Sequence, residues 1–358
     1  MEVALLDSLD WRIMYALAAE PRASFRHLAG LAGASEQTVS RRYWHMREVA
    51  GLRVIGRVAG WRVGWADWYL RLECLPGTAE MIAMGLARRA DTSWVLLASG
   101  GSEVICLFQA RSAERRDALL LDALPASHRV SRLVAHRVLH EYGGPAGCSS
   151  CRRCWGDGGA EARPGGTRVS GGERSAAPGA PSEPRTEASP LPEDDEVNLT
   201  AEDEALCERL ARDGRATNAS LGRQIGWHEA TVRRRVHELQ QSGALWFDTD
   251  LDDRALEPRS HAMLWLSVEP SQLEPVGRVV SRQPEVSFVA AVTGPTNLIA
   301  GVVSSKTSDL YAYLTDRLGR VNGIRSVETV PLIRAVKRAG SITDKVAAAR
   351  PGHRNRSL

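Results

Sequence analysis

The chain has 358 residues, of which 43% are hydrophobic and 25% are charged, and its formal net charge is +3. This length exceeds one ordinary domain of roughly 100–200 residues, and the apolar content excludes wholesale disorder. The sequence has no run of eighteen apolar residues, and six cysteines are too few for a disulfide scaffold. We therefore expect a protein of the reducing cytoplasm without a membrane span or a secretory leader. Because the net charge is small, its distribution among the segments of the chain is more informative than the total.

Two segments of the chain, residues 6–52 and 199–245, repeat one another with a constant shift of 193 and no gap. Of the 47 aligned positions, 14 are identical. The identical pairs include Asp10/Asp203, Leu17/Leu210, Arg22/Arg215, Leu28/Leu221, Gly33/Gly226, Thr38/Thr231, Val39/Val232, Arg41/Arg234 and Arg42/Arg235. A register kept over this length predicts two copies of one structural unit.

The segment between the copies, residues 143–197, differs in composition, with 11 Gly and 7 Pro among 55 residues. Such a segment cannot bury enough apolar surface to order itself, so we expect a flexible linker. Cys148, Cys151 and Cys154 near its start have a spacing that can ligate zinc or an iron–sulfur cluster. A tetrahedral site needs a fourth ligand, for which His136 and His140 are the nearest candidates. We interpret the three cysteines as incidental and expect no metal and no cofactor.

Each copy begins with a pattern of three short helices. Apolar spacing predicts helices at residues 8–19, 24–31 and 36–49, and again at 201–213, 219–225 and 229–242. Ser8 and Ser35 are candidate N-caps, and Val39, Tyr43 and Met46 form the buried stripe of the third helix. His228 takes the place of Ser35 in the second copy, which predicts a cap that is weaker by about 1 kcal/mol.

The rest of each copy alternates between strand and helix patterns. In the first copy we expect strands at 68–74, 94–99, 104–110 and 130–142, with helices at 78–90 and 112–124. In the second copy we expect strands at 261–268, 286–293, 298–304 and 324–336, with helices at 273–282 and 308–321. The order β-α-β-β-α-β predicts an antiparallel, ferredoxin-like sheet with both helices on one face. A second such sheet is the simplest cover for the open face.

Two helices joined by a short glycine-containing turn form a helix-turn-helix, whose second helix fits the major groove of DNA. The predicted DNA-binding residues lie on this second helix in both copies: Gln37, Thr38, Ser40, Arg41, Arg42, Arg47, Thr231, Arg233, Arg234, Arg235 and His237. Gln pairs with adenine and Arg with guanine, whereas we expect Thr38 and Arg42 to contact phosphate. A row of arginines can also be only a solvated helix face, but matched sites in two copies favour DNA.

The charges of the two helix-turn-helix segments differ in sign. Residues 1–64 hold 9 Arg and 6 acidic residues, whereas residues 199–259 hold 9 Arg and 12 acidic residues. Neutralisation of phosphates dominates affinity for DNA. We therefore expect the first copy to supply most of the DNA binding. The end of the chain from Arg334 is also basic, with seven Lys or Arg and one acidic residue.

These segments resemble the Lrp/AsnC family of transcriptional regulators. The resemblance rests on LDSLD and PRASFRHLAGLAGASEQTVSRR in the first copy and on GRATNASLG and TVRRRVHEL in the second. The sequence TGPTNL at Thr293–Leu298 is similar to a turn in that family's ligand-sensing and assembly domain. The resemblance implies an α+β fold, in which a winged-type helix-turn-helix domain is followed by a ferredoxin-like βαββαβ sandwich domain, the pair occurring twice.

The expected domains follow from the repeat and the resemblance. They are a first helix-turn-helix domain (1–64), a first ligand-binding and assembly domain (65–142), the linker (143–197), a second helix-turn-helix domain (198–257), a second ligand-binding and assembly domain (258–339) and a basic tail (340–358). The two sheet domains could pair within one chain as a pseudo-dimer, and we also expect homo-oligomers.

The resemblance implies a regulator that binds double-stranded DNA and responds to an amino acid or another small effector. The implied effector turns contain Gly100 and Glu103 in the first copy, and Gly294 and Asn297 in the second. Asn297 replaces the acidic residue of the family pattern, which removes an anionic partner for an amine.

Enzyme motifs are absent from the sequence, so we do not expect catalysis. The alternative is an enzyme like the sirohaem decarboxylases, which share this tandem shape. It would need histidines such as His136, His140 and His261 to bind a tetrapyrrole. A protein that only assembles with other regulators is a further possibility, suggested by the acidic second copy.

Overall fold

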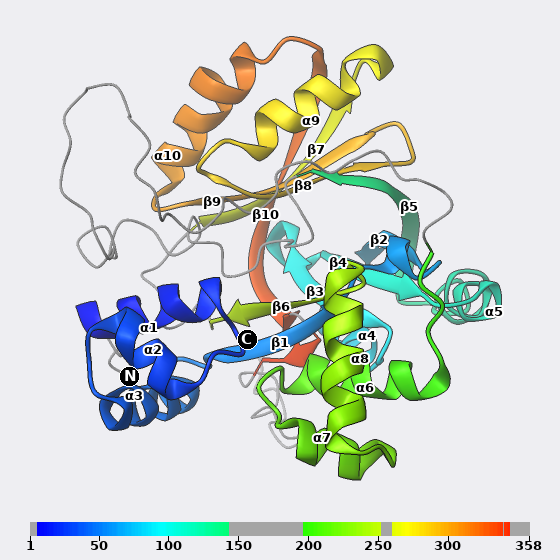
Figure 1. Ribbon diagram of the computed structural model, residues 1–358. Helices are drawn as coiled ribbons and strands as arrows, with labels where there is room; N and C mark the ends of the chain where they lie inside the picture. Colours follow the sequence, from blue (N-terminus) through cyan, green and yellow to red (C-terminus); the bar gives the residue numbers. More distant parts are fainter. Residues whose placement is uncertain (1–5, 143–195, 252–259, 339, 344–358) are drawn as a thin grey trace, which may run out of the picture.

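The computed structural model describes residues 6–142, 196–251, 260–338 and 340–343 (Figure 1). Most of the predicted linker and tail, including Cys148, Cys151 and Cys154, lies outside the described residues. The described part consists of two three-helix groups, which we call the first and second heads, and two sheet units. None of the described helices is long and apolar enough to cross a membrane.

The first head contains α1 (Ser8–Ala19), α2 (Phe25–Ala32) and α3 (Glu36–Val49), as predicted. The N-cap of α1 is Asp7, however, and not Ser8. Its carboxylate accepts hydrogen bonds from the N–H groups of Leu9 and Asp10, which a serine one residue later cannot reach.

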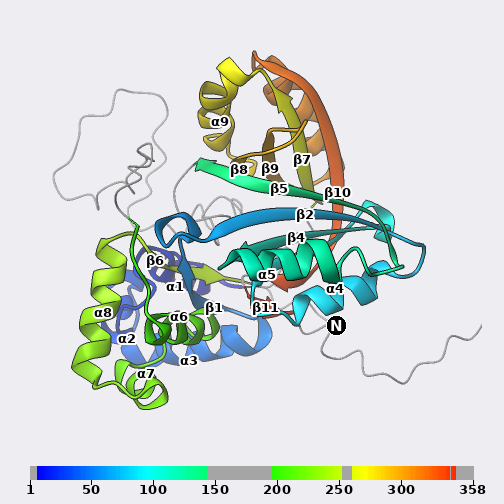
Figure 2. The same cartoon turned by 90° about the vertical axis from the view of Figure 1, so that its right-hand side faces the viewer.

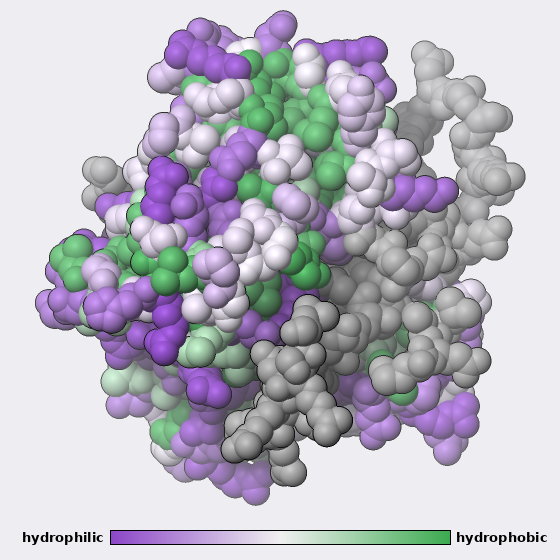
Figure 3. All heavy atoms as spheres, turned by 180° about the vertical axis from the view of Figure 1, so that it is seen from behind, coloured by the Kyte–Doolittle hydropathy of each residue, from purple (hydrophilic) through white to green (hydrophobic). Residues whose placement is uncertain are grey.

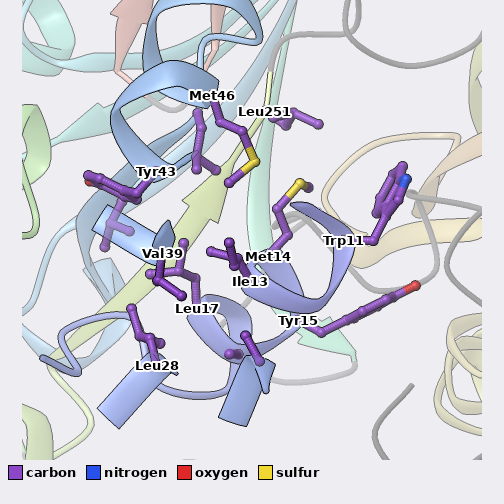
Figure 4. Close-up of a cluster of buried hydrophobic side chains, with 14 of the residues drawn as sticks. Trp11, Ile13, Met14, Tyr15, Leu17, Leu28, Val39, Tyr43, Met46 and Leu251 are labelled. Carbon is purple, nitrogen blue, oxygen red and sulfur yellow. The ribbon is translucent and has the colours of Figure 1, made fainter. Parts of the chain in front are cut away.

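The core of the first head is formed by side chains that converge from all three helices (Figure 4). The predicted stripe of Val39, Tyr43 and Met46 is buried there. Leu251, from the second half of the sequence, also belongs to this cluster. The first head is therefore completed by a residue of the second copy.

The second head contains α6 (Ala201–Arg212), α7 (Asn218–Ile225) and α8 (Glu229–Gln241), again within one residue of the prediction. In both heads the second helix ends at a glycine in the left-handed region, Gly33 with φ 65° and Gly226 with φ 79°. The side chain of Ser35 caps α3, whereas His228 gives α8 no side-chain cap. The two reading helices therefore differ in their caps, and the expected difference in stability stays a prediction.

A two-stranded antiparallel ribbon of β1 (Arg53–Val58) and β6 (Leu245–Asp250) runs between the two heads (Figure 1). These strands were not among the predicted elements. Ile55 faces Asp248, and these two positions are related by the repeat shift of 193. The approximate two-fold axis of the tandem therefore passes through this pair.

The two sheet units have the predicted β-α-β-β-α-β order. The first unit contains a 3-10 turn (Gly60–Arg62), β2 (Ala66–Cys74), α4 (Ala79–Ala87), β3 (Thr92–Ala98), a 3-10 turn (Ser99–Gly101), β4 (Glu103–Ala110), α5 (Ala113–Asp117) continued by a π-helical turn (Ala118–Ala123), and β5 (Val130–Tyr142). The second contains β7 (Ser260–Val268), a 3-10 turn (Pro270–Gln272), α9 (Leu273–Ser281), β8 (Val286–Val292), β9 (Leu298–Ser304), α10 (Thr307–Ala312) continued by helical turns (Tyr313–Arg317 and Leu318–Arg320), β10 (Ile324–Arg338) and β11 (Ser341–Ile342).

The strands of both units form one closed ring within the chain. The order is β10-β3-β4-β2-β5-β8-β9-β7, and β7 pairs again with β10. The two joins, β5 with β8 and β10 with β3, both link the last strand of one unit to the second strand of the other. Pairing of the sheets within one chain, which the sequence analysis allowed, is thus observed.

The ring separates three apolar clusters. Its interior holds Tyr69, Ile105, Trp265, Ile299 and their neighbours from both units. The outer faces are covered by α4 and α5 in the first unit and by α9 and α10 in the second (Figure 2). Seen from behind, apolar surface gathers over the second unit between polar groups (Figure 3).

Candidate nucleic-acid interface

The outer face of α3 in the first head is polar and open. Gln37 and Arg41 are exposed, and Ser40 is half-buried. The guanidinium of Arg41 makes no ion pair with any residue that the structure describes. Arg47, one turn after Trp44 on α3, lies 4.9 Å from the ring centre of that exposed tryptophan. This face therefore offers a free cation and several hydrogen-bonding groups.

Arg42 and its repeat partner Arg235 are turned toward their own heads. Arg42 pairs with Asp7 and Asp10, and Arg235 donates two hydrogen bonds of 2.7 Å to Asp203. Burial acts to raise the pKa of Asp203, but the hydrogen bonds from Arg235 and Thr200 outweigh it, so the pKa lies below its usual value. Both arginines thus fasten the reading helix to the first helix of the head, a role that the sequence analysis missed.

A signal for this role was present in the sequence. Asp10 and Arg42 are 32 residues apart, as are Asp203 and Arg235, and all four belong to the positions that are identical between the copies. Arg42 keeps 30% of its side chain exposed, so its predicted approach to phosphate stays a prediction.

The arginines of α8 in the second head are paired with carboxylates. Arg233 lies 3.1 Å from Glu229 and Arg234 lies 3.6 Å from Glu238 on the same helix. Arg235 lies 3.2 Å from Glu238 as well. Thr231 is half-buried, and His237 is exposed. The second reading helix therefore presents largely neutralised cations, in contrast to α3.

The heads are held together by a pair of residues that the repeat relates, Arg22 and Arg215. Arg22 donates hydrogen bonds to the carbonyl oxygens of Gly214 and Ala216 and to Asn218 Oδ1. Arg215 donates to the carbonyl oxygens of Pro21 and Ala23, at 2.8 and 2.7 Å. Each arginine therefore binds the turn before the second helix of the opposite head, which fixes the relative position of the reading helices.

The residues of the predicted effector turns are engaged within the protein. Glu103 is buried and pairs with Arg71, which also binds Glu328 of the second unit. The side-chain amide of Asn297 makes two hydrogen bonds to the backbone of Val268, at 2.8 and 2.9 Å. Gly100 and Gly294 have positive φ values of 70° and 114°, which explains glycine at both turns. The two turns therefore differ chemically, as the sequence predicted.

The three histidines considered for a tetrapyrrole have different neighbours. His136 is buried against Trp265 and lies 2.7 Å from the carbonyl oxygen of Thr293, and burial lowers its pKa. His140 contacts Tyr142 edge-on, and His261 pairs with Val303 in the sheet. Within the described ranges no group of His, Cys, Asp and Glu has the arrangement of a metal site.

Comparison with known proteins matches the two heads and the second sheet unit to family models. Residues 6–47 and 199–240 match the AsnC-type helix-turn-helix domain, and residues 261–342 match the Lrp/AsnC ligand binding domain. A helix-turn-helix-type transcriptional regulator of Pyrococcus horikoshii is 26% identical over 151 residues, which are 42% of this chain and 95% of the relative. One of Pyrococcus abyssi is 28% identical over 145 residues, 40% of this chain and 91% of the relative. Each relative is thus matched over nearly its whole length by about two fifths of this chain.

Among solved structures, the siroheme decarboxylase NirDL is similar over 93% of both chains, with a TM-score of 0.55 and 13% sequence identity. At this identity the likeness concerns the fold alone. It shows that the complete arrangement of two heads and two sheet units occurs in another protein.

Proposed function

Because the chain belongs to the Lrp/AsnC family of transcriptional regulators, we propose that it binds double-stranded DNA sequence-specifically and that α3 of the first head does most of the reading. The observation that carries this proposal is the contrast between Arg41, which is free of ion pairs with the described residues, and Arg234, which lies 3.6 Å from Glu238. The function is one of binding rather than catalysis.

In this proposal, α3 enters the major groove with its N-terminal half toward the bases. Gln37 pairs with an adenine edge and Arg41 with a guanine edge, while Ser40 and Thr38 reach sugar or phosphate. Arg47 contacts the DNA backbone beside Trp44. Arg42 holds the helix in place, and the exposed edge of its guanidinium contacts a phosphate.

The second head contributes less. Its arginines, Arg233, Arg234 and Arg235, would have to give up their carboxylate partners before they could bind phosphate, and Glu229 and Glu238 would then face the DNA. Like-charge repulsion of this kind weakens binding and slows association. We therefore propose a non-palindromic site, to which Thr231 and His237 add weaker backbone contacts.

A small effector is part of the proposal, since the second sheet unit matches a ligand-binding domain. An effector at the predicted turns would have to displace Arg71 from Glu103, or Val268 from Asn297. The closed ring of strands supports one chain acting as a pseudo-dimer, and larger homo-oligomers are tested by light scattering.

The test begins with genomic DNA from the source of the protein. The purified chain is incubated with sheared DNA, the retained fragments are sequenced, and their binding is measured by fluorescence anisotropy at 50 and 200 mM salt. We expect enrichment of a small set of fragments and an affinity that falls at least tenfold over this salt range. Retention no better than for unrelated DNA, by a folded protein, would contradict sequence-specific recognition.

A tetrapyrrole enzyme is the second candidate, and only the likeness to the siroheme decarboxylase fold favours it. A shift of the Soret band of added sirohaem, together with release of its carboxyl groups as CO2, would support it. We expect neither, because His136 is hydrogen-bonded to the carbonyl oxygen of Thr293 and packs against Trp265.

A further inference from the structure

A cavity of about 330 Å³ lies where the second head, the ribbon and the first sheet unit meet. Its wall is formed by Glu208 and Ala211 of α6, by Trp246 of β6, and by Asp67 and Gln109 of β2 and β4. A volume of this size is within the range of small-molecule sites. It is separate from the predicted effector turns, none of whose residues lines it.

The wall of the cavity holds two carboxyl groups with displaced pKa values. Asp67 accepts a hydrogen bond of 2.9 Å from Gln109, and burial together with the nearby Glu141 raises its pKa to about 7. Burial also raises the pKa of Glu141, and Arg57 opposes this shift. The guanidinium of Arg57 lies 3.9 Å from Asp248. Asp67 and Glu141 therefore share the influence of one nearby cation, Arg57, which Asp248 also engages.

The other charged groups of the wall are partnered or exposed. Arg111 pairs with Glu204 and Glu208, Arg89 pairs with Asp91, and Lys337 donates hydrogen bonds to the carbonyl oxygen of Arg89 and to Thr92. Arg88 and Arg212 are exposed to solvent. None of these cations pairs with Asp67 or Glu141.

Aromatic side chains form much of the remaining surface. Trp61, Trp65 and Trp246 all line the cavity, and the guanidinium of Arg111 lies 4.7 Å from the ring centre of Trp65. The indole N–H of Trp246 and the Nε–H of Arg111 are buried without a hydrogen-bond partner among the described residues. Buried donors of this kind call for an acceptor. The wall thus combines anionic groups, aromatic faces and two free donors.

We propose that this cavity binds a small organic amine with an apolar or aromatic body and one hydrogen-bond acceptor. The ammonium group of the ligand lies against Asp67 and Glu141, and its apolar body packs on the tryptophans. Its acceptor atom accepts hydrogen bonds from the free N–H groups of Trp246 and Arg111. An ammonium group also gains from the faces of indole rings.

The position of the cavity couples this ligand to the second head. Arg111, in the first sheet unit, reaches across to Glu204 and Glu208 of α6 at 3.0 and 2.9 Å. A ligand beside these ion pairs changes the contact between the first sheet unit and the second head. This coupling, unlike the binding itself, rests on the proposed function in DNA recognition.

Tyramine is a suitable probe, because it carries an amine, an aromatic ring and a hydroxyl group and stays cationic between pH 6 and 8. Its binding to the full chain is measured by calorimetry at both pH values. With a pKa of about 7, Asp67 is mostly protonated at pH 6, so we expect binding about tenfold tighter at pH 8. Equal binding of the anionic isostere 3-(4-hydroxyphenyl)propanoate, or no heat with tyramine, would overturn the site.

Substitutions locate the binding. Asp67→Asn should weaken tyramine binding about tenfold at pH 8 and reduce the pH dependence to the part that Glu141 supplies, whereas the same change at the exposed Asp122 should alter neither. Glu141→Gln serves as a second variant if Asp67→Asn melts early. Unchanged binding in both folded variants rejects the assignment.

The coupling is tested separately, by anisotropy with a retained DNA fragment. We expect saturating tyramine to change the affinity for DNA at least threefold, and Asp67→Asn to abolish this response. Binding of tyramine with no effect on DNA affinity overturns the coupling. Absence of DNA binding in every state contradicts the proposed function, while the calorimetric result for the cavity stands on its own.

Discussion

The two heads have the same three helices and share 14 of 47 aligned residues, but their reading helices present different surfaces. In α3 the arginine at position 41 is free of ion pairs with the described residues, whereas its counterpart Arg234 lies against Glu238. The shared residues maintain the fold, as Arg42 and Arg235 do by binding an aspartate in each head. The difference teaches that the two copies share a scaffold but not a recognition surface.

Removing the aspartates that bind Arg235 and Arg42 should have the largest effect on stability, because these ion pairs maintain the fold of each head. Asp203→Asn leaves Arg235 without its main partner and should destabilise the chain by about 2 kcal/mol, less than for a fully buried pair because Arg235 is 27% exposed. Asp10→Asn should cost only about 1 kcal/mol, because Asp7 still binds Arg42. Urea unfolding at pH 7 measures both.

The pH dependence supplies the control for this comparison. The pKa of Asp203 is lowered in the folded chain, so its stabilisation is present above the unfolded pKa of about 3.9 and is lost as the pH falls through the folded pKa. The difference between the native chain and Asp203→Asn should therefore shrink below pH 4. A difference that grows in acid would contradict the assignment.

The contact between the heads is tested by removing its two arginines. Arg22→Ala loses three acceptors and Arg215→Ala loses two, so we expect costs of about 2 and 1.5 kcal/mol, typical of charged hydrogen bonds that are partly buried. Amide hydrogen exchange of the turns at 21–24 and 214–218 should accelerate. Arg26→Ala, on an exposed face of α2, is the control. Equal protection in all three variants would show that the heads are held in another way.

Substitutions at the N-caps of the two reading helices should have the smallest effect on stability. His228→Ser should introduce the side-chain bond that Ser35 makes to the N–H of Thr38, and stabilise the second head by about 1 kcal/mol. Ser35→Ala should destabilise the first head by a similar amount. Urea unfolding checks both, and a destabilising His228→Ser would mean that His228 has a role beyond the cap.

The sequence predicted the helices and the sheet units because their signals are local. Helix caps, the glycines after α2 and α7, and the alternation of strands act within a few residues. The sequence does not separate Ser8 from Asp7 as the cap of α1, because both residue types are good caps and only the backbone decides between them.

The ribbon and the contacts between copies could not be predicted in the same way. β6 contains Asp248, Thr249 and Asp250, all buried, and its partner β1 is about 190 residues away. Arg22 and Arg215 are identical in the alignment, but each acts on the opposite head, which no local pattern encodes. The cavity could not be predicted either, because its wall combines residues of α6, β6 and the first sheet unit.

The central claim is that the first head carries most of the DNA recognition. Its most direct test compares Arg41→Ala with Arg234→Ala, two equivalent positions, by anisotropy on the same retained fragment over a range of salt. We expect Arg41→Ala to weaken binding at least tenfold, as for the loss of one arginine–guanine contact, and Arg234→Ala to weaken it less than threefold. Equal losses, or a larger loss for Arg234→Ala, would contradict the account.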